Sequence, residues 1–206
     1  MLVILVFVMA CTPTPVPANT PQLIKIHATP ATQAWLSNAY NCADKLGIIL
    51  SNVDDPNQAE INIRMGEPAK LSSPSFLIGQ EDLLVVTHRE SKVQNLTIEE
   101  VRSLFSNPEA LGMEIWVFAS GQDIQEVFSR DVLGGHVVTS LARVAVSPQQ
   151  MSDTLNQDKN AVGILPRHWK AGTVRDVFTY PNIPVLALVK SEPQGLVKAL
   201  LACLQK

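Results

Sequence analysis

The sequence has 206 residues, of which 46% are hydrophobic and 17% are charged, with a formal net charge of -3 at pH 7. This composition is typical of a globular protein, and the length suits one large domain or two small lobes. The mild acidity provides no basic footprint for nucleic acid, and no basic run indicates an anionic membrane surface. We therefore expect no nucleic-acid partner.

The first residues have the features of an export signal. Nine apolar residues, 2–10, precede Cys11. A bilayer span needs roughly 20 apolar residues, so this run fits the apolar core of a secretory signal instead. The ending Val8-Met9-Ala10-Cys11 resembles a bacterial lipobox, in which the cysteine is lipidated, although no Lys or Arg precedes the apolar run. We expect residues 1–11 to be a lipoprotein signal peptide with its lipobox; the alternative is a buried strand.

A proline-rich stretch follows Cys11 directly. Residues 12–22 read "TPTPVPANTPQ" and contain four prolines. Such a segment is an extended, semi-rigid tether that cannot pack a core. The sequence thus predicts an extracytoplasmic domain that is anchored to the cell membrane of a bacterium through lipid alone.

The remaining cysteines form an even pair. If Cys11 carries lipid, Cys42 and Cys203 are left, each in a predicted helix. In an oxidising compartment they can form a disulfide if the two helices pack together. Two separately buried thiols are an equal alternative.

Apolar periodicity and capping signals predict alternating strands and helices. The predicted strands are 23–28, 47–53, 59–65, 75–79, 83–87, 114–119, 161–165 and 185–189. The predicted helices begin after Thr29 and at 97, 122, 147 and 193, the second of them with a capping box formed by Thr97 and Glu100. This alternation indicates an α/β chain with a mostly parallel sheet.

One long segment carries a resemblance. Residues 79–105, "GQEDLLVVTHRESKVQNLTIEEVRSLF", are similar to a segment of the phosphate-type solute-binding proteins of ABC importers. The order of motifs continues through 114–128 and through "AVGI" at 161–164. The resemblance implies a two-lobed type 2 periplasmic-binding-protein fold, with mixed sheets flanked by helices. The first lobe is expected to be short, because only the turn at 54–58 joins its second and third strands.

The resemblance also implies a domain division and a function. The chain would cross between lobes near 87–91 and 173–179, with 23–91 plus 173–206 as lobe 1 and 92–172 as lobe 2. The protein would be a monomeric solute-binding protein that takes a small-molecule ligand and works with an ABC permease, without a cofactor. The alternative is a surface module, a sensor or protein-interaction domain that has lost the ligand pocket.

The candidate ligand-binding residues lie at two predicted helix starts. They are Thr29, Thr32, Ser120, Gly121, Gln122 and Asp123. Where the family has "S-G-T-R", with an arginine for phosphate, this sequence has a carboxylate at Asp123, which would repel that ligand. We therefore expect a ligand other than phosphate, with a neutral, zwitterionic or cationic solute suiting this carboxylate if it faces the cleft.

Local capping is the competing interpretation at both helix starts. Ser120 and Asp123 fit an S-x-x-D capping box, which would satisfy the helix start without a ligand. Thr29 and Thr32 are likewise ordinary N-cap residues.

No pattern indicates an enzyme or a metal site. The histidines lack metal-ligand spacing, and no G-x-S-x-G, H-E-x-x-H or P-loop motif is present. Arg64, Arg89 and Arg167 are the cationic candidates for an anionic ligand, each with a plain surface role as the alternative. Trp169 is a candidate for the rim of a cleft.

Overall fold

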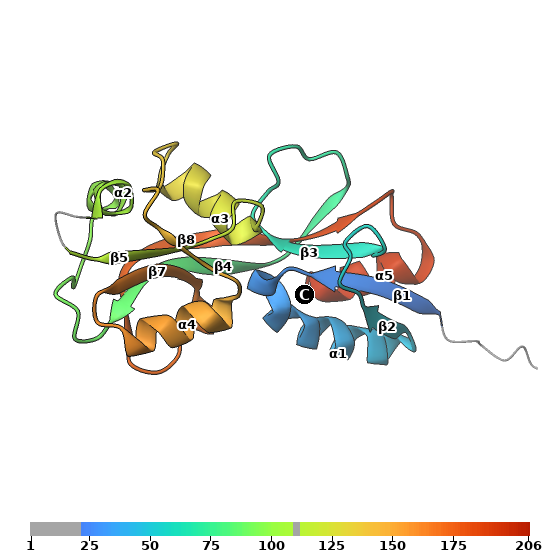
Figure 1. The fold of residues 1–206 in the computed structure, drawn as a ribbon. Coiled ribbons are helices and arrows are strands. Elements are labelled where there is room, and N and C mark those ends of the chain that lie inside the picture. Colours follow the sequence, from blue (N-terminus) through green and yellow to red (C-terminus); the bar gives the residue numbers. More distant parts are fainter. Residues whose placement is uncertain (1–21, 109–111) are drawn as a thin grey trace, which may run out of the picture.

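Figure 1 shows the fold of the computed structural model, which describes residues 22–108 and 112–206. The predicted signal peptide, Cys11 and all but the last residue of the predicted tether lie outside the described residues. In the part of the chain that is described, no helix is long and apolar enough to cross a membrane.

Strands and helices alternate along most of the chain. The strands are β1 (Leu23–Ala28), β2 (Ile49–Asn52), β3 (Ile61–Met65), β4 (Ser75–His88), β5 (Glu114–Phe118), β6 (Arg143–Ala145), β7 (Ala161–Pro166) and β8 (Val174–Val189). The helices are α1 (Leu36–Leu46), α2 (Ile98–Ser106), α3 (Asp123–Val127), α4 (Pro148–Gln157) and α5 (Gly195–Leu204). Shorter helical segments are η1 (Pro30–Trp35), η3 (Phe128–Val132) and η4 (Arg167–Trp169).

These strands form one sheet in the order β2-β1-β3-β8-β4-β7-β5-β6. β1 is parallel to β2 and β3, and β5 is parallel to β6 and β7. β8 is antiparallel to β3 and β4, and β4 is antiparallel to β7. The predicted α/β class with mixed strands and flanking helices is confirmed. The expectation of a mostly parallel sheet is wrong, because β4 and β8 insert between the two parallel sets.

The long strands β4 and β8 join two halves of the molecule (Figure 1). The first half contains β1, β2, β3, α1 and α5, and the second contains β5, β6, β7 and α2 to α4. In the first half, Ile26 and Ile63 belong to a buried cluster with Leu200 of α5. In the second half, Phe105 and Phe128 meet edge to face with ring centroids 4.7 Å apart. Each half therefore has its own apolar core.

Each long strand contributes buried residues to both cores. In β4, Ile78 belongs to the core of the first half and Leu83 to that of the second. In β8, Ile183 belongs to the core of the second half and Val185 to that of the first. The segments 87–91 and 173–179, where the crossings between lobes are predicted, lie at the carboxyl end of β4 and the amino end of β8. The assignment of the chain to two separate lobes stays a prediction, with 23–91 plus 173–206 as one and 92–172 as the other.

The long strands differ from the sequence prediction in extent. β4 is continuous where two runs, 75–79 and 83–87, were expected, and β8 extends far upstream of the predicted 185–189. The polar link at 80–82 stays extended because Gln80 and Glu81 lie opposite residues of β8. Pairing with a distant strand, which local periodicity does not report, therefore sets these lengths.

A disulfide links the helices of the first half. Cys42 of α1 and Cys203 of α5 are bonded, with their Cα atoms 5.9 Å apart. Cys42 is buried in the same cluster that contains Ala39 and Leu201, so the bond lies against the first core. The packing of the first and last helices therefore supplies the proximity that sequence alone left open.

Candidate functional site

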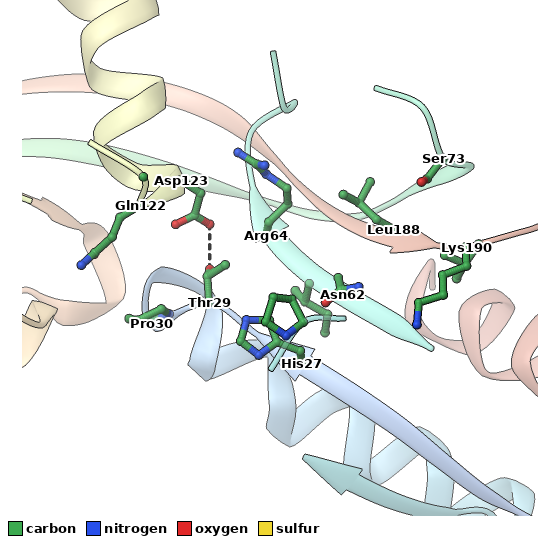
Figure 2. Close-up of a pocket in the computed structure, with 14 residues that line it drawn as sticks. His27, Thr29, Pro30, Asn62, Arg64, Ser73, Gln122, Asp123, Leu188 and Lys190 are labelled. Atoms are coloured by element: carbon green, nitrogen blue, oxygen red, sulfur yellow. Dashed lines mark hydrogen bonds between the residues drawn. The ribbon is translucent and has the colours of Figure 1, made fainter. Parts of the chain in front are cut away.

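A cavity of about 430 Å³ lies where the two halves meet (Figure 2). It opens beside the carboxyl ends of β1 and β3, opposite the start of α3. The first half contributes His27, Thr29, Asn62, Arg64 and Lys190 to its wall, and the second half contributes Gly121, Gln122 and Asp123. In open α/β folds the carboxyl ends of parallel strands are the usual place for a ligand.

The alternation of β3 places two polar side chains on the cavity wall. Ile61, Ile63 and Met65 are buried, while Asn62 and Arg64 lie on the opposite face of the strand. Successive side chains of a strand point to opposite faces, so one pattern builds both a core and a wall.

Asp123 is a buried acidic residue on the cavity wall, and it is only 4% exposed. Its Oδ2 accepts hydrogen bonds from Thr29 Oγ1 and from the Met65 backbone N–H, both at 2.7 Å, and its Oδ1 accepts from the Ile124 N–H at 2.9 Å. Figure 2 shows the contact with Thr29. Donors from both halves therefore hold this carboxylate.

The environment of Asp123 acts on its pKa in two directions. Burial raises the pKa of the Asp123 carboxyl, since the charged form loses water. The hydrogen bonds from Met65, Thr29 and Ile124, together with the charge of Arg64, oppose that effect. Of these, burial is the largest, so the pKa of Asp123 lies above its ordinary value.

The predicted self-capping of this helix is wrong. The residue before α3 is Gln122, and its side chain makes no capping hydrogen bond. Ser120 is exposed and is not on the cavity wall. Because α3 begins at Asp123 itself, its carboxylate accepts from the first half instead of bonding back to Ser120.

The two threonines at the first predicted helix start have different surroundings. Thr29 lines the cavity and uses its hydroxyl on Asp123. Thr32 is fully buried, and its hydroxyl donates to the Ile63 carbonyl at 3.1 Å. Of the candidate ligand residues, the cavity wall thus contains Thr29, Gly121, Gln122 and Asp123, whereas Thr32 and Ser120 are not on it.

Arg64 makes a second contact between the halves. Its Nη2 lies 2.6 Å from Glu126 Oε2 of α3, and its side chain is 16% exposed. The sequence indicated Arg64 as one cationic candidate among three and missed His27, Asn62 and Lys190. The alternation of Asn62 and Arg64 within a buried strand was the signal that could have found that pair.

The other sequence candidates lie away from this wall. Arg167 of η4 pairs with Asp82 at 2.8 Å, and Arg89 is exposed. Trp169 donates from its ring N–H to the Pro30 carbonyl at 3.3 Å, and Pro30 lines the cavity. Among the residues that the structure describes, no group of three or more His, Cys, Asp or Glu could hold a metal ion.

The order of strands, the flanking helices and the cavity between two halves define a type 2 periplasmic-binding-protein-like fold. No family model and no curated protein matches the sequence. Solved structures do match over most of the chain, and identities of 10–15% establish a shared fold alone.

One similar structure is assigned as a phosphate ABC transporter substrate-binding protein from Clostridium perfringens, with phosphate bound. It has 13% identity and a TM-score of 0.75, over 88% of this chain and 92% of that one. An ABC-type phosphate transport receptor from Vibrio cholerae has 15% identity and a TM-score of 0.66, over 89% and 93%. The OxyR2 regulatory domain from Vibrio vulnificus has 11% identity and a TM-score of 0.66, over 90% and 95%. The fold is thus shared by transport proteins and regulators, and membership of the phosphate-type family stays a prediction.

Proposed function

We infer that the protein is an extracytoplasmic, lipid-anchored binding module that holds a small solute between its halves and delivers it to an ABC-type importer. The observation that carries this inference is the cavity of about 430 Å³ with walls from both halves. A cavity of this size suits a compact solute, and polar groups at its wall supply orientation. The similar transport proteins and the lipobox-like start support the role in uptake.

The inferred ligand is not phosphate. The Asp123 carboxylate already uses the Thr29 hydroxyl and the Met65 N–H, which are two donors that a tetrahedral anion would need. Its negative charge would also repel phosphate in a partly desolvated site.

The rest of the wall favours a neutral or zwitterionic solute. Asn62, Arg64 and Lys190 offer polar and positive groups, and Leu188 and Pro30 offer apolar surface. A cationic solute is disfavoured, because Asp123 is held by internal donors while two cations line the wall.

A thermal-shift screen of the full chain tests this function. Phosphate, other oxyanions, amino acids, polyamines and sugars are the solutes to compare. A ligand at 100 times its Kd adds about 2.7 kcal/mol to the free energy of unfolding, which is a clear rise in melting temperature. We expect a hit among neutral or zwitterionic solutes that is lost in Arg64→Met and kept in Ser120→Ala, each measured against its own unliganded baseline. Tight phosphate binding, or a hit that is indifferent to Arg64, would contradict the assignment.

The anchor has a separate test. Lipidation of Cys11 should retain the protein in the bacterial membrane fraction, and Cys11→Ser should release it into the soluble extracytoplasmic fraction. Mass spectrometry of the N-terminal peptide reports the acyl groups directly. A wild-type chain that is soluble and unmodified would contradict the proposed localisation.

A second candidate function is recognition of another protein, as a sensor or interaction module. Four apolar side chains around the edge strand β6 are strongly exposed: Val137 at 81%, Leu141 at 65%, Val144 at 53% and Val146 at 76%. Exposed apolar groups beside a free strand edge are typical of an interaction surface. Neighbouring permease and ATPase genes would favour uptake, and a neighbouring kinase gene would favour this second function.

A further inference from the structure

Two of the three donors to the Asp123 carboxylate belong to the opposite half of the molecule. Thr29 follows β1 and Met65 ends β3, so both come from the first half, while Asp123 begins α3 of the second half. Both of their hydrogen bonds to Oδ2 are 2.7 Å long. This arrangement has the chemistry of an oxyanion site, in which hydroxyl and backbone N–H groups surround negative oxygen.

The surrounding packing shows that the halves are closed at this point. Met65 and Ala31 come from the first half, yet their side chains belong to the apolar cluster of the second half. The Arg64 guanidinium also lies close enough for its charge to act on the Asp123 carboxyl. The carboxylate is therefore enclosed by a hydroxyl, two N–H groups and a nearby cation.

We propose that Asp123 is an intramolecular ligand, whose carboxylate occupies an oxyanion site formed by Thr29, Met65 and Ile124 and thereby joins the two halves. The group that this site would accept from solution is a small carboxylate or oxyanion. While Asp123 is in place, its charge and its volume exclude such an anion. The proposal does not depend on whether a solute binds in the rest of the cavity.

Two other contacts between the halves differ from this one. The Arg64–Glu126 pair is 2.6 Å long, but the Glu126 side chain is 37% exposed. Trp169 reaches the Pro30 carbonyl at 3.3 Å, through neutral groups. Asp123 alone among these three provides a buried anion, so its removal alone should leave a vacancy for an added anion.

The first experiment is anion rescue in the full chain. Wild type, Asp123→Ala and Ser120→Ala are melted with increasing sodium formate, acetate or phosphate, with sodium chloride at matched ionic strength as the reference. We expect Asp123→Ala to melt at a lower temperature and to recover with formate or acetate along a saturating curve. Wild type and Ser120→Ala should respond as they do to chloride. A second change, Thr29→Val in the Asp123→Ala chain, should raise the anion concentration for half-recovery at least tenfold.

Three results of the rescue experiment would each overturn the proposal. One is an anion-specific stabilisation of wild type as large as that of Asp123→Ala, which would mean that the site is open. Another is an Asp123→Ala chain that folds and responds to formate and acetate only as to chloride. A third is a rescue that does not change with Thr29→Val.

Amide hydrogen exchange keeps the proposal testable if Asp123→Ala does not fold. Asp123→Asn preserves the side-chain shape but removes the charge, so the Met65 N–H loses a strong acceptor. We expect this amide to exchange at least tenfold faster in Asp123→Asn than in wild type, and to be unchanged in Ser120→Ala. Unchanged exchange of the Met65 amide in Asp123→Asn would contradict the role of the carboxylate in joining the halves.

Discussion

Replacing Thr29 by valine removes the hydroxyl that donates to Asp123 across the contact between the halves and that also lies 3.0 Å from the Thr32 hydroxyl. Valine keeps the branched shape of threonine but cannot donate, so the Asp123 carboxylate loses a partner at 2.7 Å. A hydrogen bond to a charged group contributes about 1.5–3 kcal/mol, and a buried carboxylate cannot regain water. The Met65 and Ile124 N–H groups still hold it. We therefore expect Thr29→Val to lower the free energy of unfolding by about 1.5–3 kcal/mol.

Urea denaturation of the full chain measures this loss. Thr29→Ser is the matched control, since it retains the hydroxyl and should stay within about 0.5 kcal/mol of wild type. A double-mutant cycle with Asp123→Ala identifies the partner: Thr29→Val should cost at least about 1 kcal/mol less in that background. An equal cost of Thr29→Val in both backgrounds would refute the assignment of the hydrogen bond to Asp123.

Three further predictions concern the rest of the chain and its pH dependence. Replacing Cys42 and Cys203 together by serine should lower the free energy of unfolding by about 2–5 kcal/mol, because the disulfide constrains a long loop of the unfolded chain. Reductant should lower the urea midpoint of wild type and leave that of the variant unchanged. Gly79→Ala should cost about 1–3 kcal/mol, because an added Cβ would lie 2.1 Å from the Trp35 ring; an unchanged urea midpoint would mean that this ring moves freely. Burial raises the pKa of Asp123 in the folded state, so the folded state binds the proton more tightly than the unfolded state does. The free energy of unfolding of wild type, relative to that of Asp123→Asn, should therefore fall as the pH rises from the unfolded pKa, about 4, through the folded pKa. Above the folded pKa it should stay constant. Urea denaturation at each pH measures this free energy. A rise in the stability of wild type relative to Asp123→Asn over this pH range would contradict the conclusion that burial outweighs the hydrogen bonds in setting the pKa of Asp123.

Local patterns predicted much of the fold. β1 coincides with the predicted strand 23–28, and α2 begins one residue after Thr97, as its capping signal indicates. The upstream part of β8 and the edge strand β6 were not predicted. These segments are polar or short, and they are extended because they pair with β4 and β5. Non-local pairing contributes most where local preference is weakest.

The site shows the same division between local and distant interactions. The sequence placed Thr29, Gly121, Gln122 and Asp123 among the candidates because short polar residues at helix starts are ordinary anion or capping groups. It could not place His27 or Lys190, since neither belongs to a local motif. Only the packing of β1, β3 and β8 against the start of α3 brings these residues to one wall.

Two similar capping patterns show what the sequence determined and what the tertiary structure decided. At the start of α2, where both side chains are exposed, Thr97 and Glu100 form the predicted capping box. At the start of α3, the similar pair Ser120 and Asp123 does not form one. Asp123 bonds instead to Thr29, which is 94 residues away, since the closed halves bury the carboxylate beside donors that must be satisfied. The sequence determined that a carboxylate stands at this helix start, and the burial of its partners decided which groups it binds.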